Sequence, residues 1–257
     1  MKVVLLAGGL GTRLAEQTEV RPKPMVEVGN RPMLWHIMKY CAQFGFNEFY
    51  VALGYKGAVI KQYFMDYYAM NSDVTVDLGE GSVEIHQKHK EDWKVHLIDT
   101  GQLTNTGGRL QRVLPWLDDQ TFMLTYGDGV CNVDLHKLRD FHKSQNAGAT
   151  ITAVRPPARF GNVTFNDHRV QCFTEKSQTE AGWINGGFIM MEPSVGQYLT
   201  GDDCSLEHDM LEGLAAEGKL SAYCHDDFWQ CMDTKREVDL LQRLWDSDHC
   251  PWRIWRD

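Results

Sequence analysis

The chain has 257 residues, of which 43% are hydrophobic and 24% are charged, a composition typical of a soluble globular protein. Its formal net charge of -9 argues against a nucleic-acid polymer as partner, because phosphate backbones are bound through an excess of lysine and arginine. A small phosphorylated ligand needs only a local cluster of positive groups, so this class of ligand stays open.

The first 155 residues alternate between predicted strands and predicted helices. Apolar runs predict buried strands at 2–7, 49–54, 94–99, 121–127 and 149–155. Amphipathic stretches predict helices at 32–45, 58–68, 108–117 and 134–144. Asp134 is the expected N-cap of the last of these helices. This order predicts a mostly parallel sheet with helices on both faces.

From about residue 160 the pattern changes to antiparallel β structure. Residues 161–176 alternate around the turn residues Asn166 and Asp167, which predicts a hairpin. The segments 186–192 and 225–234 are also typical of extended chain. We expect antiparallel additions to the same sheet, and a single domain over residues 1–257, because no segment rich in Pro, Gly or Ser divides the chain.

The seven cysteines are scattered, odd in number and without a CxxC pair, so they indicate neither a disulfide framework nor a zinc site. This usage favours the reducing cytoplasm. The apolar run 3–7 is too short to cross a membrane, and the N-terminal segment lacks the pattern of a secretory signal. We therefore expect a cytoplasmic protein with no membrane association.

The segment GGLGTR follows the first predicted strand. Ligands of parallel α/β sheets bind at the carboxyl ends of strands, where glycines let backbone N–H groups approach a phosphate and Arg13 could pair with its oxygens. A Walker loop is excluded because no Lys-Ser/Thr follows, and the dinucleotide pattern GxGxxG fits at Gly9 and Gly11 but fails at Leu14. The residues alone leave a phosphate-binding loop, a dinucleotide loop and a plain tight turn as alternatives.

Lys23 stands between Pro22 and Pro24. Prolines fix φ and donate no N–H, and a residue that precedes proline is biased toward extended backbone. The segment is therefore predicted to hold a lysine on a stiff, extended strut. The alternative is a solvated lysine in a rigid loop.

Two aspartates follow predicted extended segments. Asp128 lies between two glycines in YGDGV, and Asp233 ends FWQCMD. A carboxylate flanked by glycines is open to a ligand, and Mg2+ prefers a few carboxylate oxygens together with substrate phosphates. The pair is predicted as a magnesium site, with two ordinary turn aspartates as the alternative.

The segment TNTGGRL places Arg109 just inside a predicted helix N-terminus, a position that favours anions. Thr104 and Thr106 offer hydroxyl groups in the loop before it. A plain helix start is the alternative.

Together these motifs resemble those of the sugar-1-phosphate nucleotidylyltransferases. GGLGTRL followed by PKPMVEVGNRPMLWHIM is similar to the family signature, a GGxGTR loop with a Lys-Pro lysine shortly after it. The stretches GYKGAVIKQYF, LTYGDGV, PPARFGNV, WINGGF and FWQCMDT are similar to the members that transfer a cytidylyl group to glucose 1-phosphate, and the likeness extends to PWRIW. The thymidylyl- and uridylyl-transferring relatives usually carry a proline after GTRL, where this chain has Ala15, Glu16 and Gln17.

The resemblance implies a three-layer, Rossmann-like nucleotidyltransferase fold. It implies that CTP and α-D-glucose 1-phosphate react to give CDP-glucose, a precursor for deoxysugars and O-antigen-type polysaccharides, and pyrophosphate. It also implies Mg2+ as cofactor and a homo-oligomer. A transferase that uses dTTP or UTP is the alternative.

The resemblance also implies roles for particular residues. Arg13 and Lys23 are the implied catalytic cations, and Asp128 and Asp233 are the implied Mg2+ ligands. The implied nucleotide contacts are Leu6, Ala7, Gly8, Gly9, Leu10, Gly11, Thr12, Arg13, Lys23, Thr104, Thr106, Arg109 and Gly127. The implied sugar-phosphate contacts are Glu175, Lys176, Asn185 and Gly186.

Two positions depart from the pattern of the family. Members commonly read EKP where this chain has Ser177, and FWQPMDT where it has Cys231. Loss of a proline would soften both loops, but no implied ligand residue is lost.

Overall fold

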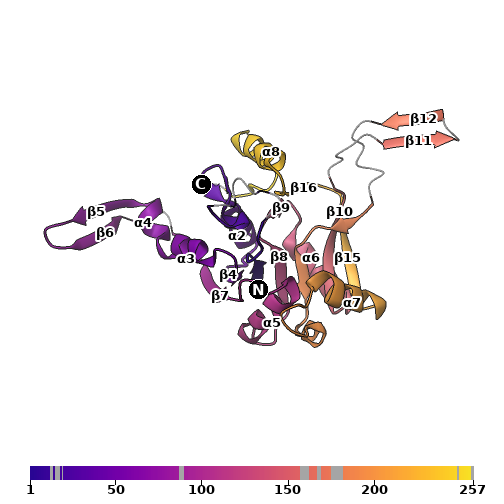
Figure 1. The fold of residues 1–257 in the computed structure, drawn as a ribbon, viewed down its shortest axis with the longest axis horizontal. Helices are drawn as coiled ribbons and strands as arrows, with labels where there is room; N and C mark the ends of the chain where they lie inside the picture. The colour runs from indigo at the N-terminus through magenta and orange to yellow at the C-terminus, as the bar shows by residue number, and fades with distance from the viewer. Residues whose placement is uncertain are drawn as a thin grey trace.

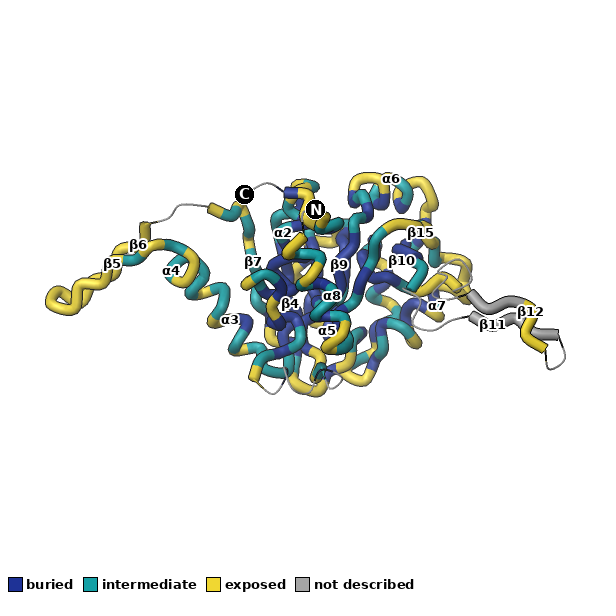
Figure 2. Tube along the Cα trace, turned by 90° about the horizontal axis from the view of Figure 1, so that it is seen from above, coloured by how far each residue is buried: buried dark blue, intermediate teal, exposed yellow. Residues whose placement is uncertain are grey.

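A computed structural model describes residues 1–11, 14, 18, 20–86, 90–156, 162–166, 169–174, 182–247 and 249–255, with the backbone alone for 162–166 and 172–174. The hairpin of β5 (Asp73–Asp77) and β6 (Ser82–His86) projects from an α/β body beside α4 (Tyr67–Asn71) (Figure 1). Figure 2 shows that this hairpin is almost entirely exposed, whereas the buried residues gather in the centre of the body.

The centre of the body is a sheet whose parallel strands come from the first half of the chain. β1 (Lys2–Leu6) pairs in parallel with β4 (Glu48–Leu53) and with β8 (Phe122–Tyr126), and β7 (Lys94–Asp99) pairs in parallel with β4. Each was predicted from its apolar run. Because these strands are parallel, their carboxyl ends meet at one edge of the sheet.

The second half extends this sheet with antiparallel strands. β14 (Ile189–Met191) lies antiparallel between β8 and β10 (Ala149–Val154), and β13 (Ile184–Asn185) also pairs antiparallel with β10. Over the described residues the sheet has eight strands in the order β13-β10-β14-β8-β1-β4-β7, with β15 (Leu220–His225) on β10. The predicted mixed, mostly parallel sheet is confirmed.

Parts of the second half differ from the prediction. β15 was not predicted, and it runs parallel to β10. The predicted hairpin forms as β11 (Asn162–Asn166) and β12 (Arg169–Thr174), but it is a two-stranded sheet of its own. β16 (Trp229–Cys231) pairs with β9 (Gly129–Cys131) in another separate ladder. Each of these strands pairs within its own ladder rather than at an edge of the main sheet.

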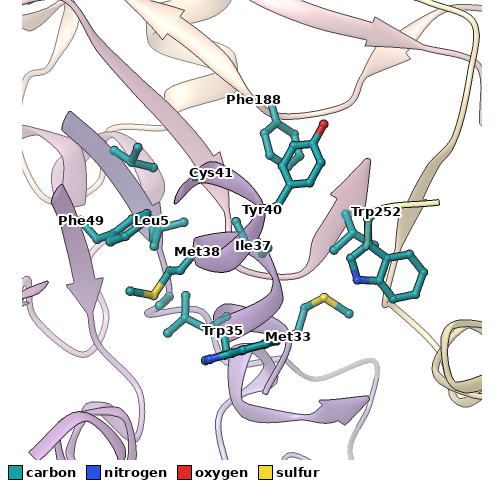
Figure 3. Packing of buried hydrophobic residues seen from close by; sticks show 14 of the residues in the cluster. Leu5, Met33, Trp35, Ile37, Met38, Tyr40, Cys41, Phe49, Phe188 and Trp252 are labelled. Carbon is teal, nitrogen blue, oxygen red and sulfur yellow. The ribbon is translucent and has the colours of Figure 1, made fainter. Parts of the chain in front are cut away.

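Helices cover both faces of the sheet. Side chains alternate along β1, so Leu5 packs in one core with α2 (Met33–Ala42), while Leu6 packs in a second core with α5 (Thr106–Val113). Figure 3 shows the first core, in which Met38 of α2 lies near Leu5. Helix, sheet and helix therefore form the three predicted layers.

The other helices divide between the same two faces. The side of α2 also carries α3 (Gly57–Met65), α6 (Leu135–Gln145) and α8 (Lys235–Asp246), and the side of α5 carries the π-helix η6 (Leu206–Leu211) and α7 (Glu212–Ala216). The short 3-10 turns are η2 (Lys23–Met25), η3 (Leu114–Trp116) and η5 (Pro193–Tyr198), and a small ladder joins β2 (Glu27–Val28) to β3 (Arg31–Pro32). None of the helices in the described ranges is both long and apolar enough to span a bilayer.

Local signals in the sequence account for several helix ends. The Asp134 carboxylate accepts hydrogen bonds of 3.0 Å from the backbone N–H groups of His136 and Lys137, which confirms it as the N-cap of α6. The single helix predicted at 58–68 is instead divided at Asp66 into α3 and α4. The helix predicted at 108–117 forms as α5 over Thr106–Val113, and its last part is the 3-10 turn η3 around Pro115, because proline cannot donate the next helical hydrogen bond.

Candidate active site

A cavity of about 550 Å³ opens at the carboxyl ends of β1 and β8, beside the start of α5. This is the edge of the sheet at which the glycine loop was predicted to bind a ligand. Its lining includes the predicted residues Leu6, Ala7, Gly8, Gly9, Gly11, Lys23, Thr104, Thr106, Arg109, Gly127, Asp128 and Asp233. Leu10 is exposed and does not line the cavity.

The glycine loop is both tightly packed and open to the cavity. A Cβ atom at Gly8 would clash with the Arg109 guanidinium and force that hydrogen-bonded group to shift. Gly11 has a φ of 63°, in the left-handed region that favours glycine. A Cβ atom at Gly9 would meet nothing within 4 Å. The loop therefore has the bare backbone that approach to a phosphate requires.

Arg109 is buried, and its hydrogen bonds connect the ends of several strands. Its Nη1 donates to the carbonyl groups of Leu53 and Gly101 at 3.1 and 2.7 Å, and its Nη2 donates to that of Gly8 at 3.0 Å. Burial lowers the pKa of Arg109, an effect to which the charge of Arg112 adds. The guanidinium therefore fixes the floor of the cavity, and its predicted nucleotide contact stays a prediction.

Lys23, Asp128 and Asp233 form one charged cluster in the cavity. The Lys23 ammonium donates to a carboxylate oxygen of Asp128 and, at 2.5 Å, to Oδ1 of Asp233. Burial by itself would lower the pKa of Lys23, but the charge and hydrogen bonds of the two aspartates raise it overall. The lysine is therefore charged at neutral pH, and the structure brings the three predicted residues together.

The β9–β16 ladder brings the two aspartates together. Cys231 of β16 lies opposite Gly129 of β9, and the backbone N–H of Met232 donates to the carbonyl of Asp128 at 2.8 Å. Each aspartate thus lies at an end of the same short ladder. A strand pairing, rather than proximity along the chain, sets the separation of the two carboxylates.

The two carboxylates fit a magnesium ion. Both contact the same Lys23 nitrogen, so one oxygen of each carboxylate lies against a single positive group. Hard oxygen donors of this kind suit Mg2+. Cys231, Asp233 and Glu237 make another close group, but the Glu237 carboxylate already accepts the backbone N–H groups of Asp233 and Thr234 in the capping box of α8. Asp128 and Asp233 are therefore the better pair.

The backbone around Lys23 differs from the prediction in its conformation. Lys23 is the first residue of the 3-10 turn η2 rather than part of an extended strut. The hydrogen bonds from Met25 N–H to the Pro22 carbonyl, at 2.8 Å, and from Val26 N–H to the Lys23 carbonyl stabilise the turn against the bias imposed by the following proline. Pro22 is the N-cap of this turn, and Pro24 is buried within it.

Gly127 joins this turn to Asp128, the predicted metal ligand. Its N–H donates to the carbonyl of Leu6 at 3.0 Å, and a Cβ atom on it would lie 2.9 Å from Cγ of Pro24. Any larger residue before Asp128 would therefore push against the turn that carries Lys23. Because Gly127 has no side chain, the turn that carries Lys23 can pack closely against the residue that precedes Asp128.

Residues at the start of α5 line another part of the cavity wall. Asn105 is the N-cap of α5, and Thr104 is buried beside it. The Thr106 hydroxyl accepts from the N–H of Leu206 at 2.9 Å and donates to Glu207 at 2.8 Å. Its hydrogen bonds are thus directed at η6, and its predicted contact with a nucleotide stays a prediction.

Asn185 and Gly186 lie at the neighbouring wall. The Asn185 side-chain amide donates to the Tyr126 hydroxyl at 3.4 Å, and the Gly186 carbonyl accepts from Trp229 Nε1 at 2.7 Å. Tyr126 and Trp229 both line the cavity, so the predicted sugar-phosphate segment is next to the predicted metal site. Thr12, Arg13, Glu175 and Lys176 lie outside the described residues.

Three residues of the site were not predicted. Tyr126, Trp229 and Glu207 hold the walls of the cavity together through hydrogen bonds between distant segments. The neighbours of Tyr126 and Trp229 in YGDGV and FWQCMDT pointed to the right segments. Nothing in the sequence around Glu207 indicates its partners, which lie 81 and 101 residues away.

Comparison with known proteins shows similarity over the whole chain. A family model described as nucleotidyl transferase matches residues 2–257. Glucose-1-phosphate cytidylyltransferase of Salmonella typhimurium is 47% identical over 256 residues, covering 99% of this chain and 100% of the relative. A mannose-1-phosphate guanyltransferase of Yarrowia lipolytica is 29% identical over 250 residues, covering 94% of this chain and 62% of the relative.

Solved structures share the fold at low sequence identity. HddC from Yersinia pseudotuberculosis superposes with a TM-score of 0.69 at 23% identity, covering 95% of this chain and 99% of that protein. A UDP-glucose pyrophosphorylase from Acinetobacter baumanii gives a TM-score of 0.66 at 19% identity, covering 95% and 92%. With a cavity of the expected composition and a full-length match, the chain belongs to the nucleotidyl transferase family, within which its full-length similarity is to the glucose-1-phosphate cytidylyltransferases.

Proposed function

We propose that the protein transfers the cytidylyl group of CTP to α-D-glucose 1-phosphate, giving CDP-glucose and pyrophosphate. The observation that carries the proposal is the full-length similarity, 47% over 256 residues, to a relative named for this reaction. The geometry supports it, because one cavity brings together a glycine loop, a fixed lysine and two carboxylates.

Mg2+ is the proposed cofactor, held by Asp128 and Asp233. When bound, the ion would supply positive charge to neutralise the phosphate oxygens. Both carboxylates line the same cavity as the glycine loop, so they are the residues that would hold the ion there.

The residues of the chain would act by positioning and by charge. The backbone around Gly9 would hold the triphosphate, and the Lys23 ammonium would stabilise the charge that develops around the α-phosphorus. A sugar-phosphate oxygen would attack that phosphorus in line as pyrophosphate leaves, so no protein nucleophile is needed. Burial, with the charges of Glu237 and Asp233, raises the pKa of the cavity thiol Cys231 to about 12, which keeps it protonated and a poor nucleophile.

Nucleotide choice tests the proposal directly. With glucose 1-phosphate held constant and pyrophosphate release as the readout, we expect kcat/KM to be highest for CTP among CTP, UTP, dTTP and ATP. One well-placed hydrogen bond to the base edge corresponds to a preference of about tenfold. A higher kcat/KM for dTTP or UTP would replace the proposal with the alternative transferase, and no turnover with any of the four would refute it.

Lys176 is proposed to hold the phosphate of the incoming sugar. We expect Lys176→Ala to raise the KM for glucose 1-phosphate by about 10- to 100-fold, because a charge-assisted hydrogen bond contributes about 1.5–3 kcal/mol. The KM for CTP should change much less. Lys137→Ala, which removes an exposed lysine of α6, is the control. Equal changes in both KM values would place Lys176 elsewhere.

The remaining expectations from the sequence stay predictions. These are the homo-oligomer, the cytoplasmic location and the use of the product in deoxysugar and O-antigen-type polysaccharide synthesis.

A further inference from the structure

The carboxylate of Glu207 joins two walls of the cavity. Its Oε1 accepts a hydrogen bond of 2.7 Å from the Tyr126 hydroxyl, and its Oε2 accepts one of 2.8 Å from the Thr106 hydroxyl. Ser205 donates a third, at 3.0 Å, to Oε2. One side chain of the π-helix η6 is thus the shared acceptor for hydroxyl groups of β8 and α5.

The two hydroxyl groups belong to different parts of the proposed site. Thr106 is the first residue of α5, on the wall that was predicted to bind the nucleotide. Tyr126 ends β8, two residues before Asp128, and its hydroxyl also accepts from Asn185 on the sugar side. A path of hydrogen bonds therefore runs from Thr106 through Glu207 and Tyr126 to Asn185.

The arrangement requires an ionised carboxylate. An ionised carboxylate only accepts hydrogen bonds, so it can accept one from each of the three hydroxyl groups at once. Burial by itself would raise the pKa of Glu207, but the hydrogen bonds from Tyr126 and Thr106 lower it overall. A glutamine in its place would present an amide N–H2 to one of the two walls, where a hydroxyl now donates.

We propose that Glu207 is a positioning residue, whose carboxylate sets the start of α5 relative to the end of β8 that carries Asp128. The inference rests on the proposed function. Glu207 does not line the cavity itself, while both of its main partners do. It would act by aligning the nucleotide wall with the metal ligand and the sugar side.

Glu207→Gln tests this role. Because a misplacement of about 1 Å in an aligned site costs about 10²-fold in rate, we expect kcat to fall by about 10- to 100-fold. The KM values for CTP and glucose 1-phosphate should change by less than about threefold, since most binding contacts are retained. Glu212→Gln is the matched control, because Glu212 is an exposed carboxylate of the adjoining α7 whose partner is His208. It should leave kcat unchanged.

The double variant of Glu207→Gln with Tyr126→Phe distinguishes a positioning role of Glu207 from a merely structural one. If the Tyr126 hydroxyl acts through Glu207, the substitution should lower kcat about tenfold in the wild type and little further in Glu207→Gln. A wild-type kcat in Glu207→Gln, or equal losses from Tyr126→Phe in both backgrounds, would overturn the proposal. If Glu207→Gln does not fold, the pair Thr106→Val and Tyr126→Phe gives the same test, because additive losses would show that the two walls are not coupled.

The outcome for Glu207 can be told apart from the outcome for the reaction. The wild type is assayed first with all four nucleotides, and the variants are then compared with the nucleotide that it prefers. An unexpected nucleotide preference would change the proposed function but not the comparison. An active wild type with an equally active Glu207→Gln variant would refute the positioning role alone.

Discussion

The Asp128→Asn variant is expected to lose turnover at ordinary Mg2+ concentrations while keeping its fold, and Asp233→Asn is expected to do the same. Each substitution removes one of the two negative charges that converge on a single position in the cavity. A metal ion that neutralises phosphate charge stabilises the transition state by several kcal/mol. A loss of about 4 kcal/mol of this stabilisation lowers the rate about 10³-fold. Steady-state pyrophosphate release measures the loss, and calorimetric titration with Mg2+ measures binding separately.

Asp140→Asn is the control for this pair, because Asp140 is an exposed aspartate of α6 outside the cavity. Circular dichroism should show the same fold for all three variants. Wild-type activity in excess EDTA would remove the metal from the proposal, and unchanged Mg2+ binding in both site variants would place the ion elsewhere.

The Lys23→Met variant is expected to lose kcat by roughly 10²- to 10³-fold, or about 3–4 kcal/mol, by analogy with the loss of an oxyanion donor. Methionine keeps most of the stem and removes the charge. The KM for CTP should change much less, because backbone donors of the glycine loop bind the ground state and the transition state alike. The backbone of Lys23 is held by the turn η2, so only its side chain has to move from the two carboxylates to the phosphates.

The same variant is expected to bind Mg2+ more tightly in the absence of nucleotide. Lys23 occupies the position between the two carboxylates, and its removal leaves two like charges facing each other. A lower kcat together with a higher metal affinity separates Lys23 from a residue that only supports the fold. Lys39→Met, which removes a lysine paired with Glu91 at 2.8 Å outside the cavity, should change neither quantity. If Lys23→Met keeps kcat and loses only CTP affinity, Arg13 becomes the leading catalytic cation.

The fold was predictable where local pattern decides the structure. The apolar runs of β1 and β4 and the periodic apolar residues of α2 are strong signals, although α2 is buried almost all round rather than on one stripe. β15 was missed, since its burial alternates weakly along the strand and its place is set by pairing with β10. The pairing partner of a strand depends on the whole chain, which periodicity does not report.

The candidate site was predictable where chemistry is concentrated in a short motif. Lys23, Asp128 and Asp233 were identified from their neighbours, and the structure brings the three together. The tie made by Arg109 to three strand ends, and the acceptor role of Glu207, could not be read from the sequence. Both depend on side chains that meet only after the sheet and its helices have packed.

The charged cluster also has a consequence for how the chain folds. Asp128 and Asp233 follow Lys23 by 105 and 210 residues, so two long loops must close before the three groups meet. Contacts between such distant positions form slowly, whereas helices and neighbouring strands form early. A partly folded chain with its helices in place would still lack the paired carboxylates. On the proposal that the two aspartates hold Mg2+, we expect recovery of Mg2+ binding during refolding to follow the recovery of helical circular dichroism.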